Sequence, residues 1–278
     1  MVSLIVHADD FGLSEKVNEG IIRAHIDGIL TSTSIIACGN AFDQAVDLSK
    51  ANPSLDLGIH LTLIEERPLL SPVDIPSLVL ENGYFHPHAK NFLKKYVLNK
   101  ISITDIEREF NAQFEKVFDY GLPISHIDSH QHIHILPKVF EITSGLAEKY
   151  RIKQVRIPNE RFRLYMFKRI SSYPRVLQSL ILKTIISFVD NDLIHSMPQF
   201  WGFFYGGRLN RYNLNTVIDN LPKNGVSEIM CHPGLKDSGS PYLHWEYNWN
   251  DELEALTDAK IRSLITRKGI SLMSYREM

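Results

Sequence analysis

The stretch SLIVHADD, residues 3–10, joins a run of aliphatic and β-branched residues to two adjacent aspartates. A short apolar run that ends in polar residues is typical of a strand buried in a parallel sheet. The residues that follow, Ser14 to Asp27, have the pattern of a helix, and Gly28 closes it. The chain therefore begins with one strand–helix unit.

Similar units recur along the chain, which predicts an α/β fold with a mostly parallel sheet. Further strands are expected in STSIIAC (32–38), DLGIHLTL (56–63), ISHID (124–128), QVRI (154–157), SEIMC (227–231) and ISLMS (270–274). Helices are expected at 43–50, at 104–120, from Pro137 onward and at 251–268. Residues 64–103 and 158–225 fit the unit poorly and are predicted to be insertions in a single domain spanning residues 1–278.

The pattern predicts the ends of the helix at 104–120 most clearly. Thr104 and Glu107 have the spacing of a capping box, and Gly121 follows the last apolar position.

Composition restricts the class of protein. Of the 278 residues, 44% are hydrophobic and 22% are charged, which is ordinary for a globular domain. A formal net charge of −2 argues against a nucleic-acid partner. Cys38 and Cys231 form no redox or metal motif, and the N-terminus lacks the basic region of a signal peptide. We therefore expect a cytoplasmic location.

Four polar clusters occur where predicted strands end. They are Asp9 with Asp10, His60 in GIHL, the segment 128–134, and His232 in CHPG. In barrels built of β-α units, the loops after the strands form the active-site face. The clusters should therefore meet on one rim, which indicates an enzyme.

Each cluster also has an ordinary structural explanation. Adjacent aspartates often form a turn and a helix cap, a histidine in an apolar strand is often a packed core residue, and CHPG resembles a turn. The segment HIDSHQHIH (126–134) would place its histidines on one face as a strand, or on an i, i+4 stripe as a helix, or it could be a solvated loop. Imidazoles together with a carboxylate form a familiar site for zinc or a related divalent ion.

Five motifs taken in order, HADDFGLS, TSTS, GIHL, HIDSHQHIH and CHPG, resemble the successive signatures of the YdjC-like carbohydrate deacetylases, a group that includes chitooligosaccharide deacetylase. The resemblance runs from Val2 to about Pro233. The segment IEERPLL and the basic, apolar middle of the chain are similar to the hopanoid-associated HpnK branch. The resemblance implies a distorted (β/α) TIM-like barrel that removes an N-acetyl group from an amino sugar, either a chitooligosaccharide or a lipid-linked N-acetylglucosamine.

The resemblance also implies roles for individual residues. Asp10, His60 and His130 map to the ligands of one divalent metal ion, magnesium or zinc, although other divalent ions are not excluded. Asp9 maps to the base that activates a water, and His232 to the acid that protonates the leaving amine. Gln131 stands where some relatives have a further histidine, and His7 stands where some have asparagine.

Other residues are candidates for substrate binding. The remaining histidines of the cluster, His132 and His134, are expected to orient the ligands or line a sugar pocket. The aromatic stretch 200–210 offers ring faces for a sugar, with Phe204 and Tyr205 as candidates, or it is a packed loop or strand.

The segment 161–189 has six basic residues, no acidic residue and many aliphatic ones. This composition suits either contact with an anionic membrane surface or a helix pair packed on the barrel. Two other functions stay open, a metal-dependent barrel isomerase or hydrolase of another class and a non-catalytic metal-binding protein. For the assembly of the chain, a homodimer also stays open.

Overall fold

The computed structural model describes residues 2–167, 173–189 and 196–278. The strands in these residues form one eight-stranded sheet, and every pair of neighbouring strands in it is parallel. The strands are β1 (Val2–Phe11), β2 (Ser32–Ile35), β3 (Asp56–Leu61), β4 (Ile124–Ser129), β5 (Gln154–Val155), β6 (Gln199–Trp201), β7 (Gly225–Cys231) and β8 (Ile270–Leu272). Their order is β5-β4-β3-β2-β1-β7-β6, and β8 pairs with β1. Each predicted strand is present, and β6 is additional.

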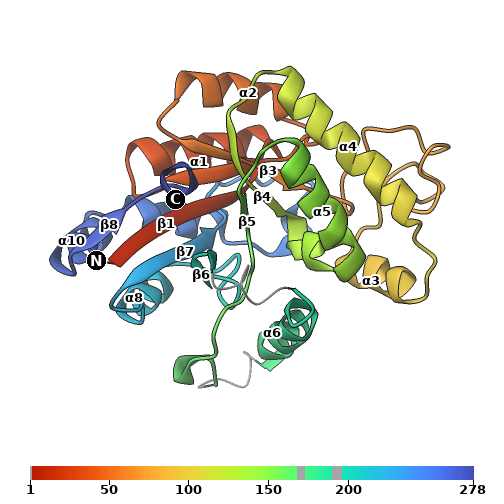
Figure 1. Ribbon diagram of the computed structural model, residues 1–278. Helices are drawn as coiled ribbons and strands as arrows, with labels where there is room; N and C mark the ends of the chain where they lie inside the picture. The colour runs from red at the N-terminus through yellow and green to blue at the C-terminus, as the bar shows by residue number, and fades with distance from the viewer. Residues whose placement is uncertain (1, 168–172, 190–195) are drawn as a thin grey trace.

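The sheet curls into a half-barrel (Figure 1). The long strand β1 makes this possible, because its first residues pair with β8 and its residues from His7 onward pair with β2. Among the described residues, no ladder joins β5 to β6, so the barrel is open on that side. The prediction of a distorted α/β barrel is confirmed.

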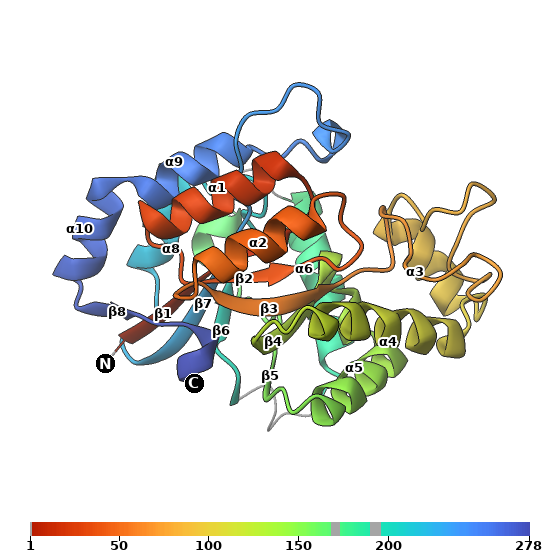
Figure 2. The ribbon, with the colours of Figure 1, turned by 90° about the horizontal axis from the view of Figure 1, so that it is seen from above.

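Helices surround the sheet. They are α1 (Glu15–Ile26), α2 (Phe42–Ala51), α3 (Ala89–Val97), α4 (Ile103–Asp119), α5 (Pro137–Lys149), α6 (Tyr173–Ile186), α8 (Arg211–Asp219), α9 (Trp249–Thr257) and α10 (Ala259–Arg267). Helix α1 contacts β1, α4 contacts β3 and α5 contacts β5. Figure 2 shows α1 and α2 running along one side of the sheet, and Figure 1 shows α6 beyond its other side.

Alternation along the strands separates apolar from polar side chains. Leu4, Val6 and Ala8 of β1 belong to the hydrophobic core. His7 and Asp9, which alternate with them on the other face of β1, are buried among polar groups inside the half-barrel. The interior of the half-barrel is therefore lined by ionisable groups, and the apolar core lies outside it.

Helix α4 begins one residue earlier than predicted, and its cap differs. The hydroxyl of Ser102 accepts a hydrogen bond from the backbone N–H of Asp105 at 3.3 Å, so Ser102 is the N-cap. The predicted capping box of Thr104 and Glu107 is wrong, because both residues lie inside the helix.

The helix predicted at 251–268 is two helices, α9 and α10. Asp258 has extended backbone angles, and its side chain accepts from the backbone N–H of Lys260 at 2.7 Å. An aspartate that caps a new helix in this way interrupts the preceding one.

The two segments predicted as insertions differ from each other. Residues 64–103 contain α3 and loops that lie to one side of the sheet (Figure 2). Residues 158–225 include α6 but also β6 and α8, which form a regular strand–helix unit before β7. Residues 168–172, within the basic segment 161–189, lie outside the described residues.

Candidate metal centre and catalytic pocket

Asp10, His60 and His130 come together at the carboxyl ends of their strands. The Oδ1 atom of Asp10 lies 2.9 Å from Nδ1 of His130 and 3.4 Å from Nε2 of His60. One donor atom from each residue lies within 4.8 Å of the other two, and each residue is at most 5% exposed. The structure thus brings together the three predicted metal ligands.

The chemistry of this group fits a cation. Oδ2 of Asp10 and Nε2 of His60 are buried without a hydrogen-bond partner among the described residues. Leaving such atoms unpaired is costly, and coordination of a metal ion would satisfy them. One carboxylate oxygen and two imidazole nitrogens are suitable donors for a divalent ion.

A carboxylate holds the far nitrogen of each imidazole. Nδ1 of His60 lies 2.8 Å from Oδ1 of Asp128, and the Ser34 hydroxyl donates to Asp128 at 3.0 Å. Nε2 of His130 lies 2.9 Å from Oε2 of Glu65. Carboxylates placed in this way fix the orientation of metal-binding imidazoles. Burial lowers the pKa of His60, but Asp128 and Asp10 outweigh burial and raise it to about 9.

The backbone at Asp10 separates the two adjacent aspartates. Asp10 has a φ of 70°, and the register between β1 and β2 shifts between Ala8 and Phe11. A left-handed backbone at a residue other than glycine costs about 1 kcal/mol or more, and such residues concentrate at functional sites. Asp10 thereby faces the histidines, while Asp9 faces different partners.

Asp9 lies beside the metal group. Its Oδ2 accepts from Nη1 of Arg156 at 2.9 Å, and its Oδ1 lies 3.0 Å from Nδ1 of His7. Burial raises the pKa of Asp9, and the charge of Arg156 opposes this rise. A carboxylate with a raised pKa on a cavity wall is suited to accept a proton.

Arg156 is the main site residue that sequence reasoning missed. It is fully buried, and Nη1 lies 2.8 Å from Asp9 and 2.7 Å from Asp128, while Nη2 lies 2.7 Å from Glu228. His7, Asp9 and Asp128 also have the spacing of a metal group, but this guanidinium already provides the positive charge among them. An arginine inside the apolar run QVRI was the available signal, because a charge on a buried strand requires partners.

The histidine cluster is neither a continuous strand nor an α-helix. Strand β4 ends at Ser129, and a short 3-10 helix, His130–Ile135, follows with left-handed backbones at Gln131 and His132. The turn directs His130 to Asp10 and places His132 on the cavity wall. His134 lies in the interior instead, with its ring nitrogens 2.6 Å from the Ser129 hydroxyl and 2.8 Å from the Arg156 carbonyl oxygen.

His232 lies on the same cavity wall as Asp9. Its backbone N–H donates to Glu252 at 2.6 Å, and its Nδ1 has no hydrogen-bond partner among the described residues. Burial lowers the pKa of His232, so a proton on this ring is given up readily. Helix α1 packs closely against the loop that follows β7 and carries His232. A Cβ added at Gly20 of this helix would lie only 2.4 Å from the Cα of Gly234 in the loop.

A cavity of about 580 Å³ is lined by Asp9, His130, His132, His232, Trp245 and Tyr247, whereas Asp10 and His60 lie behind its wall and do not line it. Phe203 also lines it, whereas the predicted substrate-binding residues His134, Phe204 and Tyr205 do not. Of the substrate-binding predictions, the structure places only His132 at the cavity.

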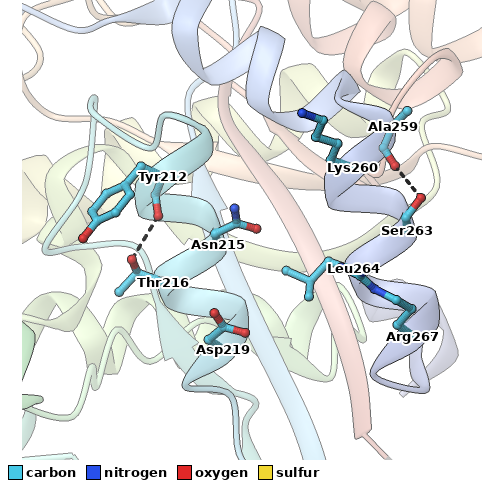
Figure 3. Close-up of a pocket in the computed structure, with 9 residues that line it drawn as sticks. All are labelled: Tyr212, Asn215, Thr216, Asp219, Ala259, Lys260, Ser263, Leu264 and Arg267. Atoms are coloured by element: carbon cyan, nitrogen blue, oxygen red, sulfur yellow. Dashed lines mark hydrogen bonds between the residues drawn. The ribbon is translucent and has the colours of Figure 1, made fainter.

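A second hollow, of about 790 Å³, lies between α8 and α10 (Figure 3). Tyr212, Asp219, Lys260 and Arg267 are among its lining residues. The hydroxyls of Thr216 and Ser263 donate to carbonyls of their own helices. None of the candidate ligands or catalytic residues lines this hollow, so the cavity beside Asp9 is the candidate catalytic pocket.

Comparison with known proteins places the chain in a family. The sequence matches the family described as YdjC-like protein over residues 3–267. A carbohydrate deacetylase from Geobacillus stearothermophilus is 35% identical, covering 98% of this chain and 96% of that protein. A chitooligosaccharide deacetylase from Yersinia enterocolitica is 30% identical, covering 99% and 98%. A crystal structure from Enterococcus faecalis, described as a proposed cellobiose-phosphate cleavage protein, is 26% identical with a TM-score of 0.75, covering 99% and 98%.

Proposed function

The chain belongs to the YdjC-like protein family, and from this membership we propose that it is a metal-dependent deacetylase that removes the N-acetyl group of an amino sugar. The observation that supports the proposal best is the buried group of Asp10, His60 and His130, whose members Asp10 and His60 have donor atoms without a partner in the part of the chain that the structure describes. Asp9, the residue before Asp10, lines the cavity beside this group.

Asp10, His60 and His130 would hold one divalent ion, either magnesium or zinc. When bound, the ion would polarise the acetyl carbonyl and stabilise the negative charge that develops on its oxygen. Asp128 and Glu65 would keep the two imidazoles oriented through their far nitrogens.

The remaining steps fall to side chains of the cavity wall. Asp9 accepts the proton of the attacking water, and Arg156 holds its carboxylate in place. His232 donates a proton to the departing amine. The ring faces of Trp245, Tyr247 and Phe203 are placed to pack against the sugar.

Aliphatic side chains also line the cavity, and we call this set the apolar arm. They are Leu93, Ile133, Ile135, Leu136, Ile181, Leu182 and Ile185, and His88, Lys90, Arg175 and Gln178 line the cavity as well. The apolar faces of a chitooligosaccharide are small and interrupted by hydroxyls, whereas a hydrocarbon chain joined to the sugar would contact many of these side chains. We therefore propose a lipid-linked N-acetylated amino sugar as the substrate.

Helix α6 and the residues on either side of it carry exposed apolar side chains, which we call the apolar face. Leu164 is 89% exposed, Leu177 60% and Phe188 73%, and the exposed Ile181 also lines the cavity. Basic side chains lie in the same segment, among them Lys183. We propose that this face contacts an anionic membrane from the cytoplasmic side. Among the described residues, no helix has the length and hydropathy needed to span a bilayer.

Release of acetate tests the proposed activity. We expect the purified protein to release acetate from N-acetylated sugars, to lose this activity after chelation, and to regain it with an added divalent ion. Chitooligosaccharides and N-acetylglucosaminyl lipids should be compared, each with magnesium and with zinc. No acetate from any substrate with any ion would refute the proposal.

The apolar arm can be tested with one substitution on α6. Leu182→Gln should lower kcat/KM for a lipid-linked substrate in detergent micelles by about tenfold, the effect of losing roughly 1.4 kcal/mol of apolar contact. Activity on a soluble chitooligosaccharide should not change. Leu98→Gln is the matched control, because Leu98 is exposed, lies outside α6 and does not line the cavity. Equal losses on both substrates would contradict a lipid-binding arm.

A further inference from the structure

A buried carboxylate connects the two segments that border the open side of the half-barrel. Glu160 lies in the segment after β5 and is 5% exposed. Its Oε1 accepts from the backbone N–H of Gly202, the residue after β6, at 3.2 Å, and its Oε2 accepts from that of Phe204 at 2.8 Å. Since no ladder joins β5 to β6 among the described residues, these hydrogen bonds of a side chain join the two segments there.

The loop that receives this carboxylate, residues 202–206, is held at both ends. Gly202 has a φ of 106°, and a Cβ there would lie 2.4 Å from the carbonyl oxygen of Met230. A larger residue could not occupy this position unless β7 moved. At the far end, Nη2 of Arg175 on α6 donates to the carbonyl oxygen of Gly206 at 3.2 Å. The loop therefore has one defined path beside the cavity.

Phe203 is the residue of this loop whose side chain the carboxylate controls. It lies between the two residues whose N–H groups bond to Glu160, and it lines the catalytic cavity. Its ring centroid lies 5.6 Å from that of His132, and the guanidinium of Arg175 lies 5.3 Å from the ring centre. Because the allowed side-chain rotamers depend on the backbone angles, fixing the backbone on both sides of Phe203 also fixes the direction of its ring.

The two N–H groups explain why a carboxylate stands at this position. Two donors need two acceptor oxygens, which a carboxylate has, whereas an amide has one acceptor oxygen and one NH₂ group. Burial raises the pKa of Glu160 to about 7, and the two N–H groups, Arg163 and Arg175 oppose this rise. Glu160 is therefore largely ionised at pH 8, where both of its oxygens accept.

We propose that Glu160 is a positioning residue that holds Phe203 as an aromatic platform for the sugar ring of the substrate. The inference rests on the proposed function and deepens it, since it names the residue that fixes one wall of the sugar site. Glu160 does not line the cavity, so it acts through the loop. A platform contacts the sugar in the ground state and the transition state alike, so its loss should weaken binding and leave the chemical step unchanged.

The first test measures the loop without catalysis. In the full-length protein at pH 8, hydrogen exchange followed by NMR should be about tenfold faster at the amides of Gly202 and Phe204 in Glu160→Gln than in the wild type. Glutamine has nearly the same size, but its NH₂ group faces one of the two N–H groups and cannot accept from it. Unchanged exchange at both amides would overturn the role of Glu160 in holding the loop.

The second test separates positioning from a general loss of structure. In the assay of acetate release from a chitooligosaccharide, Glu160→Gln should raise KM about three- to tenfold, with kcat and metal content unchanged. Phe203→Leu should have a similar effect. The double variant should be no worse than either single variant, because both changes remove the same contact. Effects that multiply in the double variant, or a fall in kcat at unchanged KM, would refute the positioning role.

Asp105→Asn is the matched control. Asp105 is also a buried carboxylate that accepts from the backbone N–H of a loop residue, Ser77 at 3.0 Å, and neither residue lines the cavity. The control should leave KM unchanged, and an equal rise in KM would overturn the specific role of Glu160. No acetate release by the wild type would refute the proposed function, whereas normal turnover with an unchanged KM in Glu160→Gln would refute only the positioning role.

Discussion

Replacement of Asp9 by asparagine is expected to lower kcat for acetate release by about 10²- to 10⁴-fold, because the variant lacks the group that accepts the proton of the attacking water. Asparagine has nearly the same size, and its carbonyl oxygen can still accept from Arg156. Asp9 is not part of the group formed by Asp10, His60 and His130. The variant should therefore retain its metal.

His130→Ala provides the contrast. It removes one of the three donors and leaves Asp10 and Glu65 without their shared partner. We expect most of the bound metal to be lost together with activity. Metal content by elemental analysis and initial rates should be measured on both variants at equal protein concentration. Equal loss of metal in the two variants would contradict the separation of roles between Asp9 and the ligands.

Arg156→Met is expected to destabilise the protein by about 3–5 kcal/mol, the usual effect of leaving buried charges without their partner. Asp9, Asp128 and Glu228 surround this guanidinium, and removing it leaves three buried carboxylates close together. Such a loss is a large part of the stability of a typical domain, about 5–15 kcal/mol. Unfolding in urea, followed by circular dichroism, measures the change.

Two controls define the origin of this effect. Arg156→Lys retains the charge but cannot span all three carboxylates, so its loss of stability should be intermediate. Arg208→Met removes an exposed arginine whose nearest ion pair, with Glu246, is 4.0 Å long, and should have little effect. A urea midpoint for Arg156→Met equal to that of the wild type would contradict the proposed role of Arg156.

The sequence predicted that the polar clusters would gather at one edge because each lies at or just after the end of an apolar run, and the resemblance to the YdjC-like family then singled out Asp10, His60 and His130 as the candidate ligands. Parallel strands share one direction, so the ends of β1, β3 and β4 reach the same edge of the sheet, and Asp10, His60 and His130 meet there. The order of the motifs identified the family, and the roles implied for Asp9 and His232 agree with their places on the cavity wall.

The partners of these residues could not be predicted in the same way. Glu65 and Glu252 lie in a loop and a helix whose patterns give no sign that their carboxylates reach His130 and the backbone of His232. His134 lies away from the cavity because a 3-10 helix with left-handed residues follows β4, and the alternation of the strand does not continue.

The sequence by itself determined the parallel sheet and the edge at which the polar residues gather, since these depend on local periodicity and on the shared direction of the strands, and the order of its motifs singled out the candidate ligands. Only the tertiary structure decided that the barrel is open between β5 and β6, that Arg156 joins β1, β4 and β7 inside it, and that aliphatic side chains of α6 line the cavity. These features depend on how far the sheet curls and on contacts between residues distant in sequence, which no local pattern encodes.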